Sequence, residues 1–221
     1  MLIAPNTVVM NISEIRKNYL LHHLEEETTG NDPIEFFLQW LSEALESQVI
    51  EPTAMVLSTV GNDCRPSSRV ILLKGCEEGE FHFYTNYNSA KGRQIEIHPI
   101  GSLVFHWKEL ERQVRIEGII TKLTPEKSDE YFNSRPLESR LGASISPQSE
   151  VIESREFLER MFQRKSEEIN ASGSINRPVN WGGYALKPDV IEFWQGRASR
   201  LHDRLRFRLY DGKWIRERLA P

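Results

Sequence analysis

Several short clusters in this 221-residue sequence combine side chains of the types that bind phosphate groups and flat rings. The first is the run RVILLK, in which Arg69 and Lys74 bracket the apolar residues of a predicted strand. Because side chains alternate along a strand, residues five apart should lie on opposite faces. One strand could then present a cation to each of two anions. Alternatively, both are solvated charges at the strand ends, since Lys and Arg are mostly exposed.

A second cluster, Tyr84-Thr85-Asn86 followed by Ser89 and Lys91, lies where a strand is predicted to end and a helix to begin. A cation in the first turn of a helix opposes the helix dipole, at a cost of roughly 0.3 to 1 kcal/mol. A bound phosphate reverses this sign, because the helix N-terminus and the lysine attract the same anion. The alternative is a lysine that faces solvent, where the cost is small.

A third cluster lies in the run ERQVR, where Gln113 and Arg115 share one face of a predicted strand. A glutamine amide both donates and accepts hydrogen bonds, which suits the edge of a heterocycle. The alternative is the ordinary polar exterior of a barrel.

The fourth cluster contains Tyr131 and Arg135, which are four residues apart and so meet on one helical face, with Ser139 close behind. A phenol, a guanidinium that donates two bonds and a hydroxyl would together clamp a phosphate. The glutamine and serine at 148–149 lie in a loop that could bind similarly. Alternatively, Pro136 simply ends the helix and Arg135 caps its carbonyls.

The fifth cluster places Trp194 near Arg200, His202 and Arg204. A histidine there titrates near neutral pH. The alternative is a charged loop in which Asp203 pairs with either arginine. Taken together, the clusters predict binding of one or two phosphorylated aromatic ligands.

A helix is predicted to begin at Asp32-Pro33, since Asp caps and Pro suits the first turn. Its predicted buried face comprises Ile34, Phe37, Leu38, Leu41 and Leu45. Further helices are predicted over 13–21, 89–98, 124–134 and 154–169, and strands over 54–60, 67–74, 80–85, 102–107, 113–123, 183–186 and 190–194. A hairpin over 205–218 turns at Asp211-Gly212.

Many short strands with helices between some of them predict an α+β, mainly β fold: an antiparallel barrel with helices packed outside. We expect a flexible N-terminal segment over 1–31 and a single barrel domain with helical additions over 32–221. The sequence has no Gly-x-Gly-x-x-Gly after a strand, no phosphate-binding loop and no cluster with metal-ligand spacing, so no metal is predicted.

The composition narrows the class of protein. A formal net charge of -4 and a pI of about 5.9 argue against nucleic-acid binding. Cys64 and Cys76 flank a predicted strand and should lie about 30 Å apart, too far for a disulfide. With no recognisable signal peptide and no apolar run of transmembrane length, a cytoplasmic, membrane-free protein is expected.

The clusters, in order and across nearly the whole chain, resemble the pyridoxamine 5′-phosphate oxidase family. The resemblance rests on RVILLK (69–74), FYTN (83–86), LERQVRIEG (110–118), YFNSRPLESRLGA (131–143), QS (148–149), WGGY (181–184), IEFWQG (191–196), RLHDR (200–204) and ERLAP (217–221). Other flavin-binding split barrels share the barrel, but not the SRP, FWQG and RLHDR elements together.

The resemblance implies an FMN-binding split-barrel homodimer with FMN in clefts at the subunit interface. FMN contacts are then expected at Arg69, Val70, Ile71, Leu72, Leu73, Lys74, Tyr84, Thr85, Lys91, Gln113, Gln148, Ser149, Trp194 and Arg204. The substrate phosphate is expected at Lys74, Tyr131, Arg135 and Ser139, with Arg200 and His202 over the substrate ring as the catalytic pair. Arg16 and Tyr19 match a segment that closes over the substrate.

Two positions depart from the family pattern: Ala90 stands where an arginine is usual, and Arg140 where a glutamine is usual. The implied reaction oxidises pyridoxine or pyridoxamine 5′-phosphate at C4′ to pyridoxal 5′-phosphate, with hydride transfer to FMN, oxygen as acceptor and hydrogen peroxide as product. The alternatives are another split-barrel flavoprotein, such as a flavin reductase, or a non-catalytic carrier of FMN or pyridoxal phosphate.

Overall fold

The computed structural model describes residues 18–221, except for the side chains at 171 and 172. Arg16 and most of the predicted 13–21 helix lie outside the described residues, and residues 18–21 are not helical. Within the described chain no helix is long and apolar enough to cross a bilayer.

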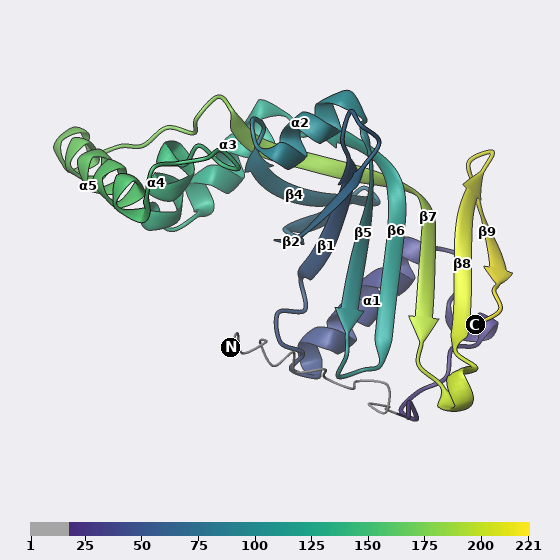
Figure 1. Ribbon diagram of the computed structural model, residues 1–221. Coiled ribbons are helices and arrows are strands. Elements are labelled where there is room, and N and C mark those ends of the chain that lie inside the picture. The colour runs from purple at the N-terminus through teal and green to yellow at the C-terminus, as the bar shows by residue number, and fades with distance from the viewer. Residues whose placement is uncertain (1–17) are drawn as a thin grey trace, which may run out of the picture.

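A nine-stranded, entirely antiparallel sheet forms the body of the protein and curls into an open half-barrel (Figure 1). The fold therefore confirms the predicted antiparallel split barrel. Its strands are β1 (Ala54–Val60), β2 (Pro66–Leu72), β3 (Gly75–Glu77), β4 (Glu80–Asn86), β5 (Ile100–Trp107), β6 (Arg112–Lys122), β7 (Trp181–Gln195), β8 (Asp203–Tyr210) and β9 (Lys213–Arg218).

The 15-residue strand β7 organises the sheet, whose order is β2-β1-β5-β6-β7-β4-β3, with β8 on β7 and β9 on β8. Residues 181–186 of β7 pair with β4, whereas residues 190–195 pair with β8. We predicted two separate strands here, over 183–186 and 190–194, whereas β7 continues through Pro188. The break is absent because β6 bulges after Glu117 and sets Gly118 opposite Pro188; a Cβ on that glycine would lie 2.0 Å from the Lys187 carbonyl oxygen.

Helices cover the sheet and extend from one end of it (Figure 1). They are α1 (Pro33–Glu46), α2 (Ala90–Ile97), α3 (Pro125–Ser134), α4 (Leu137–Ile145) and α5 (Arg155–Ser172), with short 3-10 turns at Glu26–Thr28 and Ala198–Arg200. Asp32, Ser89 and Thr124 cap their helices through backbone N–H groups, as their types predict. Neither α4, which lacks a side-chain cap, nor the three-residue β3 was predicted.

The predicted buried face of α1 is partly wrong. Leu38 and Leu45 are 42% and 57% exposed. The side chains that pack on the sheet include Phe36 and Trp40, whose rings lie 4.7 and 5.3 Å from that of Phe193. Large aromatic rings bury more apolar area than leucine does, so they determine how the helix is rotated on the sheet.

Strand β9 holds the segment that precedes α1. The Arg216 guanidinium donates to the carbonyls of Glu26 and Gly30 and to the hydroxyl of Thr29. Arg218 donates to the Glu26 carboxylate, lowering the pKa of that group to about 2. The beginning and the end of the described chain are therefore tied together.

Candidate functional site

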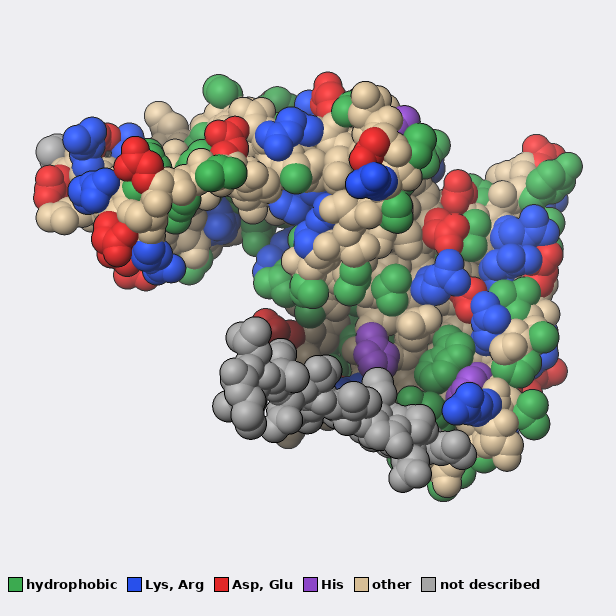
Figure 2. Space-filling model, viewed as in Figure 1, with side chains coloured by type: hydrophobic (Ala, Val, Ile, Leu, Met, Phe, Trp, Pro, Cys, Tyr) green, Lys and Arg blue, Asp and Glu red, His purple; other side chains and the backbone are tan. Residues whose placement is uncertain are grey.

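A cavity of about 840 Å³ lies between β2 and β4 on one side and α3 and α4 on the other. Figure 2 shows basic side chains gathered in the hollow beneath these helices. The lining contains these predicted cofactor and substrate residues: Arg69, Val70, Ile71, Leu72, Lys74, Tyr84, Thr85, Lys91, Tyr131, Arg135, Ser139 and Gln148.

At one side of the cavity, Lys91 is buried in the first turn of α2, with only 8% of it exposed. Its Nζ donates to Thr85 Oγ1 at 3.2 Å and to Ser89 Oγ at 3.5 Å. Burial, and secondarily the charge of Arg69, lowers the pKa of Lys91. A buried lysine at a helix N-terminus, whose partners in the described part of the chain are hydroxyls, makes an anion site.

Arg69 stands beside this lysine and is fixed by neutral groups. Its Nη1 donates to Leu57 O and Thr59 Oγ1, and its Nη2 to Ser67 Oγ and Gln94 Oε1. Burial lowers its pKa. The guanidinium is thus oriented while its charge remains available.

Arg135 ends α3 and faces the cavity. Its guanidinium lies 4.7 Å from the Trp181 ring centroid, and its buried Nη1 has no hydrogen-bond partner among the described residues. Tyr131 stacks on Tyr84 with ring centroids 3.8 Å apart, and burial raises the pKa of the Tyr131 phenol. A buried donor without an acceptor is costly, and so indicates a ligand oxygen at this point.

Lys74 lines the same cavity as Arg69, so the prediction that the two face opposite sides is wrong. The expected alternation holds only within a strand, and β2 ends at Leu72, before Lys74. Leu73, which we predicted to contact FMN, is 5% exposed and belongs to the hydrophobic core. Ser149 is exposed in the loop after α4 and does not line the cavity.

The charged side chains in the described lining of the cavity are all positive. Arg69, Lys74, Lys91 and Arg135 contribute four cations, and the described lining contains no Asp or Glu. None of the four forms an ion pair with a carboxylate of the described residues. Such a cavity attracts dianions, and a phosphate monoester carries about -1.5 to -2 at pH 7.

A second cluster contains the predicted catalytic residues. Tyr19 lies edge-on to both Trp194 and His202, with ring centroids 5.7 Å apart in each case. The Nδ1 atom of His202 accepts the backbone N–H of Arg197 at 3.1 Å. Burial, and then the charge of Arg200, lowers the pKa of His202. The imidazole is therefore neutral near pH 7, with its proton on Nε2.

Gln113, Trp194 and Arg204 form one row across β6, β7 and β8, because Trp194 pairs with both of the others. Arg204 donates to Glu192 at 2.8 Å, which raises the pKa of the arginine. The alternative that Asp203 pairs with Arg200 or Arg204 is wrong; Asp203 pairs with Arg197 and Arg218.

The two clusters lie at opposite ends of β7. Trp181 lines the cavity and Trp194 belongs to the second cluster. They lie thirteen positions apart in the strand, a length of roughly 40 Å along β7 at about 3.3 Å per residue. One chain thus does not bring Arg200 and His202 to the cavity.

Several residues that shape these sites were not predicted. Trp181, which supports Arg135, follows a polar linker and precedes two glycines, a pattern that marks close packing. Glu111 Oε2 accepts the backbone N–H groups of Leu20 and Leu21 at 2.8 and 3.2 Å, which fixes the segment carrying Tyr19. No local pattern in the sequence indicates this contact across 91 residues.

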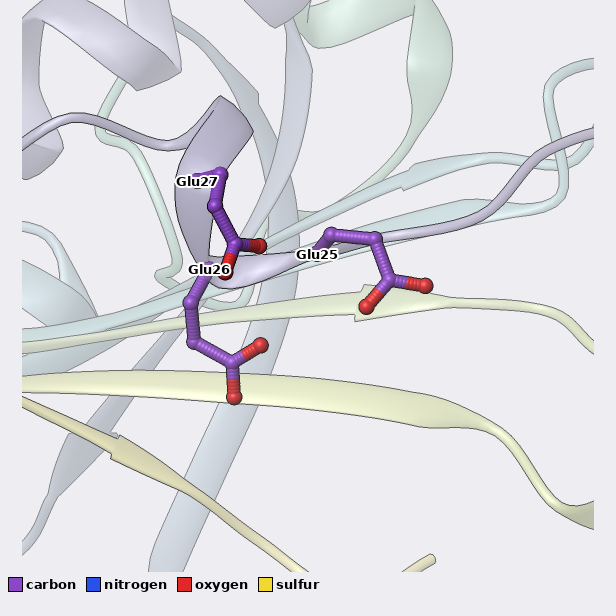
Figure 3. Close-up of side chains that lie close together, drawn as sticks. All are labelled: Glu25, Glu26 and Glu27. Carbon is purple, nitrogen blue, oxygen red and sulfur yellow. The ribbon is translucent and has the colours of Figure 1, made fainter.

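Three neighbouring carboxylates, Glu25, Glu26 and Glu27, also lie close together (Figure 3). Arg218 contacts both Glu25 and Glu26, at 3.5 and 2.5 Å. The acidic group is thus balanced by an arginine.

Comparison with known proteins identifies two matching family models. One, described as pyridoxamine 5′-phosphate oxidase, matches residues 41–167; the other, described as the pyridoxine 5′-phosphate oxidase C-terminal dimerisation region, matches residues 181–221. Proteins named pyridoxine/pyridoxamine 5′-phosphate oxidase are similar along the chain. That of Verminephrobacter eiseniae is 51% identical over 212 residues, covering 96% of this chain and 99% of the relative. That of Acidovorax sp. is 53% identical over 211 residues, covering 96% of each.

Solved structures with the same fold include PhzG from Burkholderia lata in complex with tetrahydrophenazine-1-carboxylic acid. It has a TM-score of 0.85 and 30% identity, and covers 91% of this chain and 99% of its own. A pyridoxamine 5′-phosphate oxidase-related, FMN binding protein from Nostoc punctiforme has a TM-score of 0.69 at 18% identity, covering 86% and 98%. This second likeness supports the fold alone.

Proposed function

The chain belongs to the pyridoxamine 5′-phosphate oxidase family, and from this premise we propose that it oxidises pyridoxine or pyridoxamine 5′-phosphate to pyridoxal 5′-phosphate with FMN. The observation that carries the proposal is the carboxylate-free cavity with four cations in its described lining. Cofactor and substrate each carry a phosphate, so two dianions match the charge of this lining.

The residues of the cavity fit FMN. Lys91 and Arg69, with the N-terminus of α2, would hold the cofactor phosphate, because all three attract the same anion. Residues 70–72 of β2 present backbone and apolar side chains along the same wall. When bound, FMN supplies the two-electron acceptor for C4′ of the substrate, and we propose oxygen as the final acceptor, with peroxide as product.

Arg135, Tyr131, Ser139 and Lys74 would hold the substrate phosphate. The unpartnered Nη1 of Arg135 supplies a donor that needs an acceptor, and the neutral phenol of Tyr131 supplies another. Anchoring the phosphate orients the remote C4′ atom, and such positioning can account for a large part of a rate enhancement.

Arg200 and His202 would reach the substrate from a second copy of the chain. The roughly 40 Å between the two clusters on one β7 leaves a partner subunit as the source, in keeping with the dimerisation region matched by residues 181–221. FMN would then lie at the subunit interface, where the row Gln113, Trp194 and Arg204 contacts it from the partner side.

His202 would act as a hydrogen-bond donor. Its Nδ1 already accepts from Arg197, so Nε2–H is the group left to bind the alcohol or amine of the substrate. Arg200 would cover the ring, and Tyr19 and Arg16 would close the site from outside. The unpaired thiols Cys64 and Cys76 are compatible with a cytoplasmic location, which we propose.

An oxygen-consumption assay with pyridoxine 5′-phosphate and FMN tests this function. Production of pyridoxal 5′-phosphate with peroxide release is the expected result. Tight FMN binding without turnover would indicate a carrier, and turnover that requires a nicotinamide reductant would indicate a flavin reductase.

A further inference from the structure

We propose that Gln94 is a positioning residue that directs Arg69 toward the FMN phosphate while leaving its positive charge uncancelled. The inference rests on the proposed function, because it assigns the phosphate near Arg69 to FMN. Gln94 lies on α2 and is not part of the cavity lining, so it acts through Arg69.

The hydrogen bonds define a neutral cradle, which we take as Thr59, Ser67, Gln94 and the Leu57 carbonyl. The Gln94 Oε1 atom accepts from Arg69 Nη2 at 3.2 Å and from the Thr59 hydroxyl at 2.6 Å. Thr59 in turn accepts from Arg69 Nη1 at 2.5 Å and is 1% exposed. The four hydrogen bonds of Arg69 to the described residues use the two Nη atoms, so among these residues Nε–H remains available to an anion.

The cradle contains no carboxylate, and this affects how strongly Arg69 can attract a phosphate in the cavity. Arginines in proteins are often held by carboxylates. Elsewhere in this chain, carboxylates form ion pairs with Arg112, Arg204 and Arg218. A carboxylate at Gln94 Oε1 would stand 3.2 Å from the guanidinium and would cancel its charge. It would also repel an incoming phosphate dianion.

Helix α2 contributes to the phosphate site in two ways. Lys91 supplies a cation directly from the first turn, and Gln94, three residues later, orients the neighbouring cation. Burial, and then the charge of Arg69, lowers the pKa of Lys91, so the two like charges lie close enough to repel each other. An anion bound between them would relieve this repulsion.

Replacing Gln94 with Glu and with Ala tests the inference. Gln94→Glu keeps the shape but adds the charge, and should weaken FMN binding by roughly tenfold or more. The same change should leave unaltered or raise the unfolding midpoint of the FMN-free chain, because the new carboxylate pairs with Arg69. Gln94→Ala removes one of the four hydrogen bonds that orient Arg69 without adding a charge, and should weaken FMN binding less than Gln94→Glu does.

The measurements are titration of the FMN-free full-length chain with FMN and its thermal unfolding. Gln48→Glu, at an exposed position outside the cavity, controls for the added charge and should match the parent. If Gln94→Ala binds FMN more weakly than Gln94→Glu, or if stability and affinity fall together in both, Gln94 is merely structural. Unchanged affinity in Gln94→Glu also overturns the inference. A parent chain that does not bind FMN would instead refute the proposed function, on which the inference rests.

Discussion

Replacing Arg135 with methionine should separate ligand binding from stability. In the ligand-free chain the buried Nη1 has no partner among the described residues, at a cost of about 1 to 3 kcal/mol. The contact of the guanidinium with Trp181 contributes about 0.5 to 2 kcal/mol in the opposite direction. These effects oppose each other, so the free energy of unfolding should change by about 1 kcal/mol or less. The unfolding midpoint should then move by at most about 4 °C.

Substrate binding should respond far more strongly. A guanidinium that donates to a phosphate contributes about 1.5 to 3 kcal/mol, so its loss should raise KM for pyridoxine 5′-phosphate roughly 10- to 150-fold. The phosphate is unchanged in the reaction, so kcat should fall less than kcat/KM.

Steady-state kinetics and thermal unfolding of Arg135→Met provide the test. Arg65→Met is the matched control, because the Arg65 side chain is 87% exposed and does not line the cavity. A KM equal to that of the parent would show that Arg135 does not hold the phosphate. A loss of several kcal/mol in stability would show that the guanidinium supports the fold.

Four further predictions concern the rest of the site. Ala90→Arg, which adds a cation beside Lys91, should tighten FMN binding by up to about 1.5 to 3 kcal/mol in a fluorescence titration. Unchanged affinity would show that an arginine at position 90 does not contact the FMN phosphate. His202 has a lowered pKa, so turnover should persist as pH falls just below 6.5 and be lost at lower pH, where a proton on Nδ1 would break the hydrogen bond from the Arg197 N–H that orients the ring. Arg200→Ala should raise the pKa of His202 in an NMR titration, because the substitution removes a nearby positive charge. An unchanged pKa would refute the electrostatic coupling between Arg200 and His202. Gly196→Ala should raise KM without FMN loss, because its Cβ would lie 2.7 Å from the Tyr19 ring; normal kinetics would show that Tyr19 does not close the site.

Local patterns predicted much of the fold. The strand predicted over 54–60 is β1, whose side chains alternate between buried and half-buried, and Asp211-Gly212 forms the predicted hairpin turn, with φ of 50° and 73°. The errors came from contacts distant in sequence. Pro188 remains within β7 only because Gly118 lies opposite it on another strand, and no pattern near Pro188 contains that information.

The residue types of the site were predictable, but their grouping was not. Arg69 and Arg135 are 66 positions apart in the sequence yet line one cavity, whereas Trp194 and Trp181 share a strand and belong to different clusters. Gln94 and Glu111 were missed because their roles depend on partners that are distant in the sequence. Such roles follow from the fold and not from residue type or spacing.

The contact between β9 and the segment before α1 sets an order of events during protein synthesis. Glu26 is translated 192 residues before Arg218, the arginine that binds it. At about 5 to 20 residues per second, the segment waits roughly 10 to 40 s for its binding surface. Tyr19 lies seven residues upstream of Glu26 and contacts Trp194 and His202, which are also translated late. The cluster of Tyr19, Trp194 and His202 is therefore completed only late in translation, whereas the described residues that line the cavity have all been translated once Trp181 is added.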